Sequence, residues 1–182
     1  MQTLNELEKA TLQWSYDRGI LTNGKATTQA LKLMSEAGEL AGNLNEDKDI
    51  KDDIGDCLVV LTNLANLTKT SLDACGLHQL GFRDSSGETY LERATVLDLF
   101  TNLGKLCDNV AKGLDIKVDI KLVLVNLQEL CNFYELSIVE CWNLAYEDIK
   151  DRKGFLNEQG NFIKSTDKNY QQLLLEFEGT QK

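Results

Sequence analysis

The chain has 182 residues, 42% of them hydrophobic, and a formal net charge of −10 at pH 7. This length and apolar content support a single domain, residues 1–182, and the acidic balance argues against binding of nucleic acid through its phosphates. The N-terminus has no apolar run like that of a secretory signal, and the longest apolar runs are too short to span a bilayer. We therefore expect a soluble, cytoplasmic protein that does not enter membranes.

The pattern of apolar residues predicts an all-α protein. Proline is absent, and apolar residues recur at spacings of three and four along the chain. Two pairs of helices are expected, each joined by a short connection that favours antiparallel packing. A serine that can cap a further helix follows each pair: Ser71, and Ser137 with Glu140 three residues on. The four predicted helices cover residues 27–45, 49–69, 93–112 and 115–135.

An internal duplication relates the two pairs. Residues 31–75, the first copy, align without a gap on residues 97–141, the second copy, at an offset of 66 with 17 identities in 45 positions. Two such helical hairpins packed face to face make a four-helix bundle, flanked here by further helices. The second copy then covers the apolar face of the first as a dimer partner would. The sequence leaves open whether two such chains pair again as a homodimer.

Four acidic residues distinguish the first copy from the second. Glu36 and Glu39 are spaced i, i+3, and so are Asp53 and Asp56 on the next helix. Side chains at that spacing lie on one face of a helix. Three of the four acids are lost in the second copy, where the aligned positions hold Asn102, Lys105, Asp119 and Leu122.

If the two faces oppose each other, four carboxylates converge on one volume, and their repulsion is severe unless cations lie between them. Oxygen ligands suit Mg²⁺ or Mn²⁺, and Mg²⁺ usually takes further ligands from substrate phosphates. A solvated acidic face on two surface helices would explain the same residues. Small or apolar neighbours such as Ala37 and Ile54 instead place the acids on the face expected to be buried. We interpret the four acids as a metal site for phosphoryl chemistry on a nucleotide.

At these residues the sequence resembles the MazG-like nucleoside triphosphate pyrophosphohydrolases, an all-α superfamily that also includes dimeric dUTPases. The family pattern is E-x-x-E, then E-x-x-D on the following helix, and the two motifs here read EAGE and DIGD. The third acid departs from the pattern, because the family usually has Glu where this chain has Asp53. The other similar features are Lys32, Asn63 and the segment LQWSYDRGI at 12–20, which is like the family's opening helix. Residues 140–164, ECWNLAYEDIKDRKGFLNEQGNFIK, resemble the C-terminal segment of phage and bacterial MazG-like proteins, which typically reads as an A-Y-x-E-I-K-D-R-K-G run.

The resemblance implies hydrolysis of an NTP or dNTP to the monophosphate and pyrophosphate. Mg²⁺ or Mn²⁺ held by the four acids would neutralise the triphosphate, and Glu39 would position and deprotonate the attacking water. Because the second copy lacks these ligands, one active site per chain is expected. The predicted substrate contacts are Lys32, Lys150, Arg152 and Lys153 to phosphates, Asn63 to sugar or phosphate, and Trp14 to the base.

Other interpretations stay open. The cations at 150–153 also suit the C-terminus of a helix that ends at Gly154, and a lone Trp14 on an amphipathic helix is more often a core residue. The chain could also be a non-catalytic binding or scaffold protein of the same fold, or a pyrophosphohydrolase of another phosphoanhydride such as phosphoribosyl-ATP or an alarmone. Absence of Mg²⁺ binding would favour the binding or scaffold protein, and competition among these ligands would separate the other pyrophosphohydrolases from an NTP enzyme.

Overall fold

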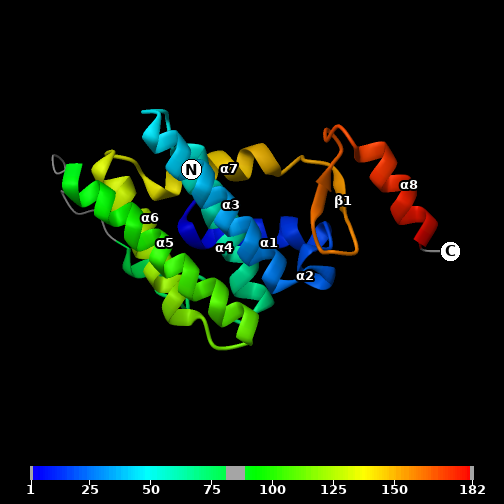
Figure 1. Cartoon of the computed structure of the whole chain (residues 1–182), viewed down its shortest axis with the longest axis horizontal. Helices are drawn as coiled ribbons and strands as arrows, with labels where there is room; N and C mark the ends of the chain where they lie inside the picture. The colour runs from blue at the N-terminus through cyan, green and yellow to red at the C-terminus, as the bar shows by residue number, and fades with distance from the viewer. Residues whose placement is uncertain (1, 81–88, 181–182) are drawn as a thin grey trace.

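The computed structural model describes residues 2–80 and 89–180 and shows an all-α protein (Figure 1). Within that part of the chain, a short two-stranded sheet is the one departure from helices and the turns between them. The predicted fold class is therefore confirmed.

Two antiparallel helical hairpins pack together as a four-helix bundle. The first hairpin joins α3 (Ala26–Asn45) to α4 (Lys51–Leu67), and the second joins α5 (Thr89–Lys112) to α6 (Lys117–Phe133). Besides these pairings, α3 packs on α5 and α4 packs on α6, which closes the bundle (Figure 1). The four predicted helices are all present, and α4 and α6 are each two residues shorter at either end than predicted.

The turns of the two hairpins have the same local structure. A residue with positive φ follows the first helix of each hairpin, Asp47 (52°) in the first copy and Gly113 (67°) in the second. The carboxylates of Asp49 and Asp115 then accept a hydrogen bond from the backbone N–H two residues on, at 3.0 and 3.1 Å. Each of these bonds satisfies an N–H in the first turn of the following helix, which has no partner within the helix.

Three further helices lie against α4, on the side of the bundle away from α5. They are α1 (Leu4–Asp17), the short α2 (Ile20–Asn23) and α7 (Ile138–Ile149), and α1 also contacts α7. Segments from both ends of the chain therefore cover the first copy.

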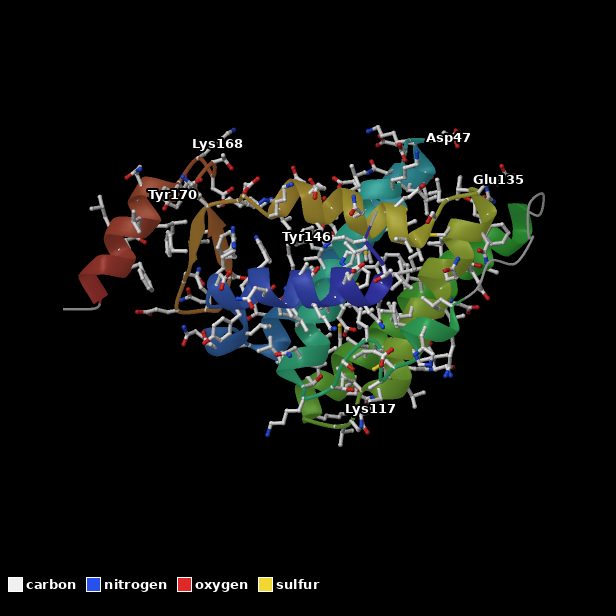
Figure 2. All side chains as sticks on the ribbon, turned by 180° about the vertical axis from the view of Figure 1, so that it is seen from behind. Asp47, Lys117, Glu135, Tyr146, Lys168 and Tyr170 are labelled. Atoms are coloured by element: carbon white, nitrogen blue, oxygen red, sulfur yellow. The ribbon has the colours of Figure 1, made fainter. Side chains whose placement is uncertain are left out.

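A β-hairpin follows α7. Its strands, β1 (Gly154–Leu156) and β2 (Phe162–Lys164), are antiparallel. Beyond it lies α8 (Tyr170–Thr180), away from the bundle (Figure 2). The rings of Tyr170 and Phe177 lie 5.6 and 5.1 Å from the ring of Phe155, so α8 packs on the β-hairpin.

The segments that follow the two copies differ. Ser137 caps α7 as predicted, because its Oγ accepts a hydrogen bond from the N–H of Glu140 at 3.4 Å. Ser71 accepts a similar bond from the N–H of Ala74 at 3.1 Å. Residues 72–80 nevertheless form only turns and the 3-10 helix Leu77–Gln79, so the further helix expected directly after Ser71 does not form.

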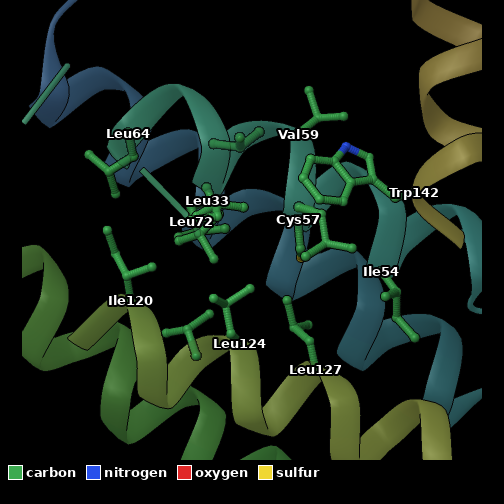
Figure 3. Packing of buried hydrophobic residues seen from close by; sticks show 14 of the residues in the cluster. Leu33, Ile54, Cys57, Val59, Leu64, Leu72, Ile120, Leu124, Leu127 and Trp142 are labelled. Atoms are coloured by element: carbon green, nitrogen blue, oxygen red, sulfur yellow. The ribbon is translucent and has the colours of Figure 1, made fainter. Parts of the chain in front are cut away.

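The hydrophobic core is centred on α4 (Figure 3). This helix is buried on nearly all sides, because α3, α6, α7 and α1 surround it. Leu124 and Leu127 of α6 and Trp142 of α7 are fully buried in this core. The central position of α4 explains why its sequence is apolar all round rather than along one stripe.

Helices α4 and α7 approach each other closely at Gly55. A Cβ on this glycine would overlap the carbonyl oxygen of Cys141 and lie 2.6 Å from the Cβ of Ala145. The glycine in DIGD therefore permits the crossing that brings α7 onto the first copy.

No single helix among the described residues combines the length and apolar composition needed to cross a membrane. The pair α6 and α7 meets both criteria only when taken together, across a bend of 104°.

Candidate functional site

A cavity opens where α1, α3, α4, the end of α7 and the β-hairpin meet. It offers about 130 Å³ to the centres of water-sized molecules. Its walls combine an apolar part, a polar part and charged groups of both signs. The residues that line it are Trp14, Ile20, Thr28, Gln29, Lys32, Glu36, Asp56, Val59, Val60, Asn63, Ile149, Arg152, Asn161, Phe162 and Lys164.

Two of the four predicted metal ligands, Glu36 and Asp56, line this cavity from α3 and α4. Glu36 is buried and forms an ion pair with Lys32, one turn earlier on α3. Burial, followed by the negative charges of Glu36 and Asp52, raises the pKa of Asp56 from its ordinary value of 3.8 to about 7. The two cavity carboxylates therefore repel each other, and a cation between them would relieve this repulsion.

The other two predicted ligands lie outside the lining. Glu39 is exposed on α3. Asp53 accepts hydrogen bonds at both carboxylate oxygens from Nδ2 of Asn43, at 3.1 and 2.8 Å. The same bond recurs in the second copy, from Nδ2 of Asn109 to Asp119 at 2.8 Å. Asp53 thus has a role in holding the hairpin that does not depend on the site.

The four acids consequently do not converge on one volume as expected. Among the residues that the structure describes, no three His, Cys, Asp or Glu side chains are grouped so that they could hold a metal ion. The i, i+3 spacing places each pair on one helix face, but α3 and α4 pack so that only one member of each pair lines the cavity.

The predicted phosphate-binding cations divide in a similar way. Lys32 and Arg152 line the cavity. Lys150 is exposed, lies outside the lining and pairs with Glu147 at 2.5 Å. Lys153 is likewise exposed and outside. Arg152 forms an ion pair with Asp148, one turn earlier on α7.

Trp14 and Asn63, the other predicted substrate contacts, both line the cavity and are both buried. Nε1 of Trp14 donates to the carbonyl oxygen of Ile149 at 2.7 Å, and its ring meets that of Phe162 edge-on at 6.0 Å. Asn63 accepts a hydrogen bond from Ser15 at 2.5 Å and donates to Gln29 at 3.4 Å. Trp14 is therefore both a core residue and part of the cavity wall.

The β-hairpin supplies a wall of the cavity that sequence reasoning missed. Asn161, Phe162 and Lys164 line the cavity from this hairpin. Its loop is tied to the start of α3, where Thr28 Oγ1 donates to the carbonyl oxygen of Gln159 at 2.9 Å. The resemblance over residues 140–164 includes these three residues, but strands of three residues are too short to show a period in the sequence.

In the second copy, the residues aligned with the two cavity carboxylates are uncharged. Asn102, aligned with Glu36, donates a hydrogen bond from Nδ2 to Asn126 at 2.9 Å. Leu122, aligned with Asp56, is 39% exposed. The second copy thus replaces two charged side chains by a satisfied amide pair and an apolar surface residue.

No known protein-family profile matches the chain, and no solved structure matches it. A stretch of 67 residues is 42% identical to the "Uncharacterized 18.2 kDa protein in rep-hol intergenic region" of Haemophilus phage HP1 (strain HP1c1). The match covers 36% of this chain and 41% of the phage protein, so the chain spans about two fifths of that relative's length.

Proposed function

We propose that the chain is a metal-dependent nucleoside triphosphate pyrophosphohydrolase, which converts an NTP or dNTP to the monophosphate and pyrophosphate. The observation that carries this proposal is the cavity. It holds the Glu36–Asp56 carboxylate pair together with three cations, next to an apolar wall with Trp14 and Phe162. A nucleoside triphosphate has the same division between a charged phosphate chain and a flat base.

The two cavity carboxylates fit a hard divalent cation. Glu36 and Asp56 offer oxygen ligands, and burial, followed by the negative charge of Glu36, raises the pKa of Asp56. Mg²⁺ commonly takes only one or two carboxylates and completes its shell with waters and substrate phosphates. When bound there, Mg²⁺ or Mn²⁺ would polarise the phosphate oxygens as a Lewis acid.

The cavity cations would bind the phosphates. Arg152 offers a planar fork suited to two phosphate oxygens, whereas Lys32 and Lys164 act as point charges. Lys32 and Arg152 are paired with Glu36 and Asp148, so phosphates would replace or share these partners. Lys164 has no ion-pair partner among the described residues, and its charge is therefore available to the substrate without an exchange.

The proton of the attacking water needs an acceptor. Glu39 remains our candidate for that role, but its exposed position means that it could act only on a substrate that projects beyond the cavity lining. Glu39→Gln is the direct test. Turnover that persists in this variant would move the role to the cavity carboxylates.

The proposal is tested by measuring pyrophosphate and orthophosphate released from a panel of NTPs and dNTPs, with Mg²⁺, with Mn²⁺ and with EDTA. Metal-dependent pyrophosphate from at least one nucleotide is expected. Absence of release from all of them, with the protein folded, would refute the proposal and favour a binding or scaffold protein. If pyrophosphate is released but phosphoribosyl-ATP or an alarmone competes with the nucleotide, the assignment changes to hydrolysis of that phosphoanhydride.

A further inference from the structure

The side chain of Arg18 joins the C-terminal ends of two helices beside the cavity. Arg18 follows the last residue of α1, where Gly19, with a φ of 74°, turns the chain toward α2. Its Nε donates to the carbonyl oxygen of Arg152 and its Nη2 to that of Lys150, both at 2.9 Å. Its guanidinium also lies 4.8 Å from the ring of Trp14, which it covers.

These bonds fall on the segment that carries Arg152 into the cavity. The last carbonyls of a helix have no N–H partner within it, so they need donors from elsewhere. Trp14 Nε1 binds the carbonyl of Ile149 at 2.7 Å, and the N–H of Ser165 binds that of Lys153 at 2.9 Å. These two contacts hold the ends of the segment, and Arg18 holds its centre.

We propose that Arg18 is a positioning residue of the cavity, which directs the Arg152 guanidinium toward the substrate phosphates by holding the carbonyl groups of residues 150 and 152. This inference rests on the proposed function. The guanidinium suits the task because its N–H groups have a fixed planar arrangement and can bind two carbonyls at once. Lysine would bring the same charge without that geometry, so Arg18→Lys separates geometry from charge.

The first test measures the mobility of the Arg152 guanidinium without any ligand. The ¹⁵N–¹H heteronuclear NOE of the Arg152 Nε–H group is measured in the wild-type chain, in Arg18→Lys and in Arg18→Ala. We expect a lower NOE in both variants, because the segment loses its central anchor. Lys25→Gln is the matched control, since Lys25 also binds a backbone carbonyl of the β-hairpin loop, at 3.3 Å, but does not line the cavity. An unchanged NOE in Arg18→Lys would overturn the proposal.

The second test is a binding cycle with inorganic tripolyphosphate and Mg²⁺, measured by calorimetry. Arg18→Ala and Arg152→Ala should each weaken binding about tenfold, a change of about 1.4 kcal/mol at 25 °C. The double variant should bind no more weakly than Arg152→Ala alone, because Arg18 acts through Arg152. An equal further loss in the double variant would show an independent effect of Arg18 and overturn the proposal. If the wild-type chain binds neither tripolyphosphate nor a nucleotide, the proposed function fails, and the NMR result still decides whether Arg18 positions Arg152.

Discussion

Two aspartates three residues apart on α4 have different surroundings and carry different tasks. Asp53 accepts hydrogen bonds from Asn43, an arrangement that the second copy repeats with Asn109 and Asp119. Asp56 faces the cavity and the carboxylate of Glu36, and its counterpart in the second copy is an apolar residue. At the scale of single residues, the duplication therefore separates an acid that holds the hairpin from one that is specific to the cavity.

The role of Asp53 can be tested with its counterpart as the matched variant. Asp53→Ala and Asp119→Ala should each lower the free energy of unfolding by about 1–3 kcal/mol, since each leaves a partly buried asparagine without its charged partner. Both should retain turnover at a temperature where they are folded. Chemical denaturation and the pyrophosphate assay measure the two effects. If Asp53→Ala alone loses turnover, Asp53 is a metal ligand as the sequence pattern predicts.

The pKa of Asp56 gives a prediction about pH and stability. Its value of about 7 in the folded protein lies above the ordinary 3.8, so the folded state holds this proton more tightly than the unfolded state does. The resulting stability is fully present below pH 3.8 and is lost as the pH rises through about 7. In EDTA, Asp56→Asn should therefore have a higher Tm than the wild-type chain above pH 7, and the gap should close in acid.

Thermal unfolding at a series of pH values measures this gap. Asp98→Asn, an exposed acid at the position aligned with Lys32, is the control and should follow the wild-type curve. Mg²⁺ should raise the wild-type Tm more above pH 7 than below it, because protons compete with the cation for Asp56. Parallel curves for the wild-type chain and Asp56→Asn would contradict the prediction.

At the scale of the elements, the cavity depends on the crossing of α4 and α7. This crossing brings the segment after α7, which carries Arg152, to the same cavity as Asp56. The crossing depends on the absence of a side chain at Gly55, where the carbonyl oxygen of Cys141 and the Cβ of Ala145 leave no room. Gly38 has the same place in the other acidic motif, but a Cβ there would meet nothing within 4 Å. The two glycines of EAGE and DIGD therefore differ in function despite their equivalent positions.

Substitution by alanine should separate these glycines. Gly55→Ala should destabilise the chain by about 3 kcal/mol or more, since α7 must move away from α4. Gly38→Ala should stabilise it by about 0.5–1 kcal/mol, because alanine fits this exposed helix position without a clash and lowers the conformational entropy of the unfolded chain. Gly104→Ala, at the matching position of the second copy, should behave like Gly38→Ala, as a Cβ there also meets nothing within 4 Å. Equal stability of Gly55→Ala and Gly38→Ala would show that α7 packs differently.

The elements also show which features the sequence can predict. The helices of the bundle are each 17 residues or longer, and their apolar residues recur at spacings of three and four, which is enough to place them. Each β-strand has three residues, too few for a period, so the wall with Phe162 and Lys164 could not be predicted. Likewise, helical spacing sets which residues share a face, but not how far α4 turns relative to α3. That rotation is decided by tertiary packing, and it leaves Glu39 and Asp53 outside the cavity.

At the scale of the whole molecule, the two copies have equivalent bundle positions and unequal surroundings. Segments from both ends of the chain, α1 with α2 and α7 with the β-hairpin, close over the first copy, and every residue that lines the cavity comes from 14–63 or 149–164. The second copy completes the bundle through α5 and α6 and contributes apolar side chains such as Leu124 to the core. The duplication therefore supplies within one chain the packing partner that a hairpin with one buried face requires.

This asymmetry predicts one substrate site per chain. Calorimetric titration with a non-hydrolysable α,β-methylene dNTP and Mg²⁺ should give a stoichiometry of one. Under the proposed function, Glu36→Gln should lower kcat/KM at least about 100-fold, because it removes one of the two carboxylates proposed to hold the metal ion. Asn102→Ala, its matched variant in the second copy, should leave turnover unchanged at a temperature where the chain is folded. Two sites per chain, or equal losses in the two variants, would mean that the second copy forms an active site of its own despite its Asn102–Asn126 pair.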